Sequence, residues 1–225
     1  GFAQLTNVTL GTNVRTIGKG AFQNTGLTAI VIPSGATNIE DEAFRGASNL
    51  SSISIPSTVT RIGANAFQDT AVRSISLNMP KIPDGALAGL NNLTQVTFGA
   101  GVQSIGIAAF QDTGLTNVTI PGNVTSIGDR AFQGCRLTNV SISGVLTNIG
   151  TNIFQGAGLR SISIPTNWTL IPAGTFLGCT NLTNATIPNG VTSIGASAFQ
   201  FTALRSLTIP NTVTNLGDRA FQGCS

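Results

Sequence analysis

The chain repeats one pattern of apolar residues about every 22 residues along its whole length. The pattern is L-x-x-V-x-I-P-x-x-V-T-x-I-G-x-x-A-F-Q-x-C/T, and residues 115–135 show it most clearly. A fixed period of roughly 20–50 residues is typical of solenoids. The leading apolar residue of each copy is Leu5, Leu27, Leu50, Val72, Leu93, Leu115, Leu137, Leu159, Leu182 or Leu204. These ten copies predict one solenoid domain over residues 1–225, which we expect to be part of a longer protein.

A single repeat cannot fold alone. Its seven or so apolar side chains contribute ~1.5–3 kcal/mol each when buried, or ~20 kcal/mol at most. Ordering the backbone costs ~1–2 kcal/mol for each residue, which exceeds that gain over one repeat. We therefore expect neighbouring repeats to stack and share one interior. The closing residue of each copy forms its largest column: Phe22, Phe44, Phe67, Leu87, Phe110, Phe132, Phe154, Phe176, Phe199 and Phe221.

The pattern also predicts local structure. In residues 115–121, apolar and polar residues alternate as in a short strand, and the Pro that follows in most copies should end it. The V-T-x-I-G segment alternates again and predicts a second short extended piece. The Gly of this segment, as at Gly128, is expected to adopt a backbone angle that other residues avoid. The x-x-A-F-Q-x segment, such as residues 129–134, is interpreted as a short α- or 3₁₀-helix.

Together these motifs resemble the BspA-like class of leucine-rich repeats over essentially all of residues 5–224. Residues 120–135, "IPGNVTSIGDRAFQGC", carry every consensus column. Met79-Pro80, Leu87 and Ile153 depart from the pattern but keep its apolar character. The resemblance implies an α/β leucine-rich-repeat solenoid, a right-handed superhelix of about ten repeats of 22–23 residues with short parallel strands and short α or 3₁₀ segments. It also implies a surface protein, often adhesive, and no catalytic residues.

Charged residues make up only 8% of the chain, against ~25% in average domains. The 11 Lys and Arg residues are scattered and Tyr is absent, so the basic groove and stacking platform of a nucleic-acid-binding protein are not expected. No apolar stretch reaches the ~18 residues of a membrane-spanning helix, and any export signal is expected to have been removed or never to have been part of this sequence. A polar surface with few charges favours an extracellular or cell-surface location.

Cys135, Cys179 and Cys224 occupy one column of the repeat, and each lies two repeats from the next. With strands ~4.8 Å apart, two steps exceed the ~7 Å between α-carbons that a disulfide tolerates. We expect free thiols that fill a turn. Metal binding is not expected, because the chain has no His and no C-x-x-C motif.

The absence of His also removes the commonest general base, so the chain is not expected to be an enzyme or to hold a cofactor. Glu40, Asp41 and Glu42 form the only acidic cluster. We interpret them as the charged start of a short helix, with a weak cation or partner contact as the alternative. Asp129-Arg130 is interpreted in the same way, as a solvent-facing pair at a helix start.

The outward side of the first strand is the best candidate for a binding surface, because consecutive repeats present two columns of uncharged polar side chains there. These are Asn7, Thr9, Ser52, Ser54, Ser74, Ser76, Asn117, Thr119, Asn139, Ser141, Ser161, Ser163, Asn184 and Thr186. Such ladders suit an extracellular protein or glycan, or another copy of the chain. The alternative is that a solvent-facing strand surface is simply polar.

Two functions remain open. The first is a non-enzymatic extracellular binding or adhesion module. The second is a structural subunit that stacks end to end or laterally into fibres or a surface layer, because neither end of the sequence shows a charged cap. The opening residues Gly1-Phe2-Ala3-Gln4 resemble the end of a preceding A-F-Q segment.

Overall fold

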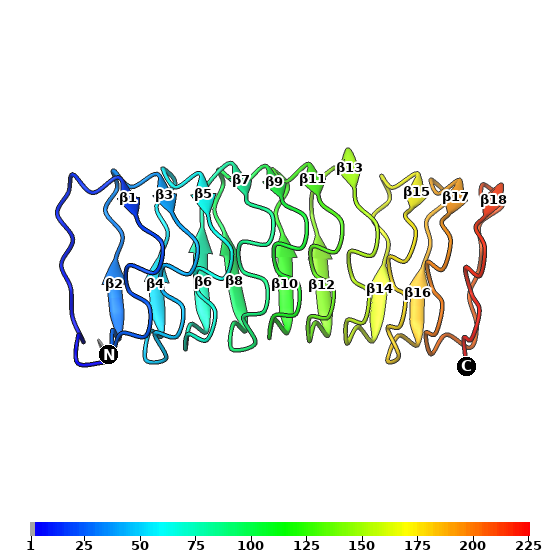
Figure 1. Ribbon diagram of the computed structural model, residues 1–225. Coiled ribbons are helices and arrows are strands. Elements are labelled where there is room, and N and C mark those ends of the chain that lie inside the picture. Colours follow the sequence, from blue (N-terminus) through cyan, green and yellow to red (C-terminus); the bar gives the residue numbers. More distant parts are fainter. Residues whose placement is uncertain (1–2) are drawn as a thin grey trace.

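The computed structural model describes residues 3–225 as a row of coils, one for each copy of the repeat and numbered 1 to 10 in chain order (Figure 1). Coils 2 to 9 each have a long strand, a short strand and a segment of turns. Figure 1 shows the two kinds of strand as two separate rows along the solenoid. Gly1 and Phe2, on which the expected preceding A-F-Q segment partly rests, lie outside the described residues.

The long strands are the predicted L-x-x-V-x-I strands. In β10, Val118 and Ile120 are buried whereas Asn117 and Thr119 are exposed, which confirms the expected alternation. Coils 1 and 10 have no long strand among the described residues. The long strands are β2 (Ala29–Val31), β4 (Ser52–Ser54), β6 (Ser74–Leu77), β8 (Gln95–Phe98), β10 (Asn117–Ile120), β12 (Asn139–Ile142), β14 (Ser161–Ser163) and β16 (Asn184–Thr186).

The V-T-x-I segment forms the short strands, which also confirms the prediction. They pair in parallel with their counterparts in neighbouring coils. The short strands are β1 (Thr16–Ile17), β3 (Asn38–Ile39), β5 (Arg61–Ile62), β7 (Lys81–Ile82), β9 (Ser104–Ile105), β11 (Ser126–Ile127), β13 (Asn148–Ile149), β15 (Leu170–Ile171), β17 (Ser193–Ile194) and β18 (Asn215–Leu216).

The prediction of short helices is wrong, because the A-F-Q segments form turns. Among residues 3–225, no helix is long and apolar enough to cross a membrane. In coil 6, Arg130 and Phe132 donate their N–H groups to carbonyls of the next coil, both at 2.9 Å. Ala131 and Gln133 instead donate to carbonyls three residues back. Arg130 has φ 56° and Gly134 has φ 68°, which no α-helix allows. Every second N–H group of this segment therefore bonds to the next coil, whereas a helix would form all of these hydrogen bonds within its own coil.

Glycine recurs at the I-G position of the repeat for a different reason from the one expected. Gly128 and Gly195 are not among the residues with positive φ. A methyl group on Gly128 would lie 2.6 Å from the backbone nitrogen of Ile107, and one on Gly195 would lie 2.5 Å from that of Ala173. Glycine is therefore needed here because the backbones of adjacent coils approach too closely for a side chain.

The interior is one continuous apolar cluster, as predicted. Phe rings of adjacent coils stack with centroids 5.2–5.9 Å apart and interplanar angles of 2–23°. Leu87 interrupts this column, and Phe98 packs edge-on against Phe110 just beyond it, with centroids 5.7 Å apart. Met79, Leu87 and Ile153 are all buried, so the departures from the pattern leave the interior apolar.

The strand ladders are interrupted at particular joints between coils. Among the described strands, the short ones form three sheets that begin at β1, β7 and β15. Coils 4 and 8, which contain β7 and β15, carry Pro83 and Pro172 where most coils have the I-G glycine. In an unbroken joint that glycine donates to the preceding coil, as Gly63 does to Ile39 at 2.8 Å. Proline has no N–H to donate, which explains both interruptions.

Candidate functional site

The fourteen candidate residues are all exposed, and most lie side by side. Parallel pairing aligns Ser52 with Ser74 and Ser54 with Ser76. It likewise aligns Asn117 with Asn139, Thr119 with Ser141, Ser161 with Asn184 and Ser163 with Thr186. The structure therefore brings these side chains onto one face of the solenoid, which we call the polar face.

The polar face is not the pair of unbroken ladders that was expected. The described long strands fall into three sheets, which are β2-β4-β6-β8, β10-β12 and β14-β16. Asn7 and Thr9 lie outside any strand. The face is thus divided between β8 and β10 and again between β12 and β14.

Sequence reasoning missed four members of the polar-face columns that lie in strands. Ala29 and Val31 align with Ser52 and Ser54, while Gln95 and Thr97 align with Ser74 and Ser76. Val31 is 79% exposed and adds an apolar side chain to the face. Their position in the repeat was the available signal, because the column fixes which way a side chain points whatever its type.

The hydroxyl groups of the protein have two different roles. Threonines at the edges of the strands bond the preceding coil: the Thr147 hydroxyl donates to Thr125 O at 3.2 Å, and that of Thr138 donates to Thr116 O at 3.2 Å. On the polar face, the only described side-chain hydrogen bond runs from Asn117 Nδ2 to Thr116 Oγ1. The remaining described side chains of the face are therefore available to an external partner.

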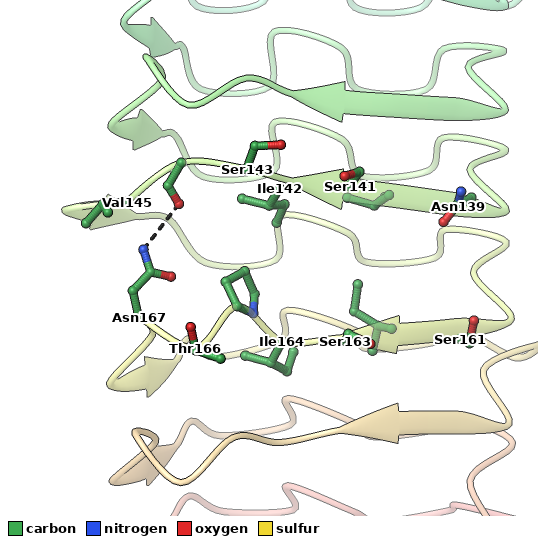
Figure 2. Close-up of a pocket in the computed structure, with 14 residues that line it drawn as sticks. Asn139, Ser141, Ile142, Ser143, Val145, Ser161, Ser163, Ile164, Thr166 and Asn167 are labelled. Atoms are coloured by element: carbon green, nitrogen blue, oxygen red, sulfur yellow. Dashed lines mark hydrogen bonds between the residues drawn. The ribbon is translucent and has the colours of Figure 1, made fainter.

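A groove of about 620 Å³ crosses the polar face between β12 and β14. Figure 2 shows Asn139 and Ser141 on one side of it and Ser161 and Ser163 on the other. Asn167 bridges one end, where its Nδ2 donates to Gly144 O at 3.2 Å. No charged side chain lines this groove.

The acidic cluster is not a helix start, which corrects the expectation. Arg61 Nη1 lies 3.1 Å from Glu40 Oε2, and Arg45 Nη1 lies 3.2 Å from Glu42 Oε1. Asp41 Oδ1 accepts the backbone N–H of Ala64 in the next coil at 3.0 Å. In the described part of the chain, no group of three or more His, Cys, Asp or Glu side chains is arranged to hold a metal.

Asp129 also bonds the next coil, so its expected role at a helix start is wrong. Its Oδ1 accepts the backbone N–H of Thr151 at 2.7 Å and the Thr151 hydroxyl at 3.2 Å. Arg130 lies in a turn with φ 56°. The acidic residue after the I-G glycine thus binds one coil to the next.

The three cysteines are free, and they bond differently from the threonines that share their column. Thr70 donates to Phe67 O of its own coil at 2.7 Å. Cys135 and Cys179 donate to Phe110 O and Phe154 O of the preceding coil, at 3.0 and 3.1 Å. Burial raises the pKa of Cys135 to about 11 and that of Cys179 to about 12, which leaves both thiols protonated and unreactive.

Known proteins share this architecture. A solved leucine-rich repeat protein from Bacteroides ovatus ATCC 8483 is 27% identical, with a TM-score of 0.83, over 99% of this chain and 65% of that one. The chain thus spans slightly less than two thirds of that protein. The pneumococcal vaccine antigen PcpA has the same fold at 18% identity, with a TM-score of 0.59, over 97% of this chain and 68% of that one.

No curated protein sequence matches the chain significantly. The family model for the BspA type leucine rich repeat region matches residues 1–114 and 103–225, with 6 copies. The two matches together span the chain. The protein therefore belongs to the BspA-type leucine-rich repeat family.

Proposed function

We propose that the chain is a non-enzymatic binding or adhesion module of a cell-surface or secreted protein, and that its polar face binds an extracellular protein or glycan. One observation carries the proposal. The exposed Ser, Thr and Asn side chains of the face are aligned by strand pairing, yet they make almost none of the coil-to-coil bonds that occupy the other threonines. Membership of a family of surface-type repeats supports it.

An array of glycans and extracellular-matrix proteins tests the proposal. The test variant replaces Ser54 and Ser76, which lie side by side on β4 and β6, with Lys. The control variant replaces Ser48 and Ser57, which are exposed outside the strands, with Lys. We expect the face variant to lose binding and the control to keep it. Equal binding by both variants would move the site away from this part of the polar face, and binding of nothing on the array would contradict the proposal.

The alternative is a structural subunit that assembles with itself. The low content of charged residues, 8%, supports it because little charge is present to oppose pairing of strand edges. Light scattering over a wide range of protein concentrations separates the two functions. A monodisperse monomer throughout would contradict self-assembly, and fibres in negative-stain images would favour it.

A further inference from the structure

The joint between coil 7 (residues 137–158) and coil 8 (residues 159–181) has lost both of its strand ladders. Neither β12 and β14 nor β13 and β15 are paired, although all four strands are described. A second opening of about 270 Å³ lies between β13 and β15. In Figure 2 the strands that border the groove are visibly farther apart than each is from its outer neighbour.

Two residues of coil 8 account for the opening. Pro172 has no N–H to donate toward β13. Trp168 replaces the smaller Val of the consensus and is 1% exposed, so a large ring fills the space where the coils separate. The turn side still holds the coils together through Phe154 N–H, which donates to Thr175 O at 3.0 Å.

The strands on both sides of the groove direct unpaired peptide groups into it. Ser143 N–H donates away from the groove, to Ile120 O at 3.0 Å, and Ile164 N–H donates away on the other side, to Thr186 O at 3.0 Å. Successive peptide groups of a strand point to opposite neighbours. The N–H and C=O groups of Val140 and Ile142 therefore face β14, and those of Ser161 and Ser163 face β12.

The floor of the groove is apolar and partly uncovered. Val140 and Ile142 are half-buried, whereas Val118 and Ile120, their paired counterparts in coil 6, are 4% and 0% exposed. An occupant with small apolar groups on its inner side would cover these side chains. Its outer side would meet Ser141, Ser163 and solvent.

We propose that this groove binds an extended peptide that alternates apolar and polar residues, inserted as an additional parallel or antiparallel strand between β12 and β14. An extended peptide supplies donors and acceptors on both edges, which is what the two unpaired strands lack. Its alternation gives apolar side chains to the floor and polar ones to solvent. This inference rests on the proposed function and names the class of partner.

The gap between β8 and β10 is the weaker candidate for such insertion. The short strands β9 and β11 are paired across it and hold those two coils together on another side. Some α-carbons of β12 and β14 lie within 8 Å of each other, and a strand between them needs ~9.6 Å. Insertion therefore requires coils 7 and 8 to move apart, and they keep no strand pairing that would oppose this movement.

The test uses synthetic heptapeptides that alternate β-branched apolar and polar residues, with scrambled sequences of the same composition as probes for non-specific binding. We expect alternating peptides to bind about tenfold more tightly than scrambled ones. Hydrogen exchange at Val140, Ile142, Ser161 and Ser163 should be fast in the free protein and slow when an alternating peptide is bound. Slow exchange of these four amides in the free protein would overturn the inference.

Ser163→Pro removes one N–H that faces the groove and leaves the pairing with β16 intact. Edge strands tolerate proline at positions whose N–H faces away from the paired strand. The matched control is Thr119→Pro. Thr119 occupies the same column in β10, and its N–H faces the gap between β8 and β10. We expect only Ser163→Pro to weaken peptide binding, by about tenfold. N-methylation of either alternate set of peptide nitrogens leaves the protein unchanged and should also abolish binding. Loss for one set only, or for neither, would overturn insertion.

The outcomes separate this inference from the proposed function. If array ligands bind the Ser163→Pro variant normally and do not protect the amides of Val140, Ile142, Ser161 and Ser163, the inference is overturned and the proposed function stands. Binding of neither array ligands nor peptides would contradict both. Protection of the amides that rises with protein concentration alone would identify a second copy of the chain as the occupant and overturn the peptide proposal.

Discussion

The rings of Phe110 and Phe132 lie face to face, with centroids 5.2 Å apart and planes inclined by only 2°. Both rings are fully buried and belong to adjacent coils. This contact repeats along most of the solenoid, so each ring is covered by the ring of the next coil. Removing one ring should therefore affect two joints at once.

We expect Phe132→Ala to lower the free energy of unfolding by about 3–5 kcal/mol, since it leaves a cavity between two neighbouring rings. Denaturant titration measures the change. Val31→Ala, at a side chain that is 79% exposed, serves as the control and should change the free energy by less than about 0.5 kcal/mol. An effect of Phe132→Ala as small as that of the control would contradict the stacked interior.

Two glycines of neighbouring coils should respond differently to alanine. Gly195 has no room for a side chain, because a methyl group there would lie 2.5 Å from the Ala173 nitrogen. Gly178 has φ 69° but open space around it. Thermal or chemical denaturation should show a loss of about 3 kcal/mol for Gly195→Ala and about 1 kcal/mol for Gly178→Ala. The reverse order would show that the close approach at Gly195 costs less than the left-handed backbone angle at Gly178, and would contradict the steric explanation of the I-G glycine.

The buried thiols should make the folded chain less stable at high pH. A thiol pKa of about 11 or 12 in the folded state, against about 8.5 in an unfolded chain, means that the unfolded chain loses these protons first. The stabilisation is complete below the unfolded pKa, and it falls by up to about 1.4 kcal/mol per thiol for each pH unit until the folded pKa is passed. Denaturant titrations between about pH 8 and 11 measure the slope.

The double variant Cys135→Thr/Cys179→Thr is the control, because Thr occupies the same column in other coils. Its stability should depend less on pH in this range. A thiol reagent at neutral pH should modify only Cys224 of the folded protein, since Cys224 is half-buried and the other two are buried. An unchanged pH slope in the double variant, or rapid labelling of Cys135, would contradict the prediction.

The joint between coils 3 and 4 should exchange amide hydrogens faster than its neighbour. Phe44 N–H donates to Ala66 O of the next coil at 2.8 Å, whereas no acceptor is found for Phe67 N–H among residues 3–225. We expect hydrogen exchange at Phe67 to be faster than at Phe44, because protection follows hydrogen bonding and local opening. Equal protection at the two amides would show that the turn side is closed at this joint in solution.

Much of this architecture could be predicted from the sequence. The alternation at Asn117, Val118, Thr119 and Ile120 predicted a strand and its exposed face, because a strand alternates its side chains whatever it pairs with. The interruptions at Pro83 and Pro172 were also present in the sequence as prolines in the I-G column. Their effect was missed because a missing N–H matters only once its acceptor in the preceding coil is known.

The sequence by itself determined the period, the two strands of each coil and the column of stacked phenylalanines, since each depends on a pattern of apolar residues within one repeat. Only the tertiary structure decided that the A-F-Q segment forms turns, because Arg130 and Phe132 donate their N–H groups to the next coil. It also decided where the coils separate. Both outcomes depend on hydrogen bonds between residues about 22 positions apart, and no local pattern contains that information.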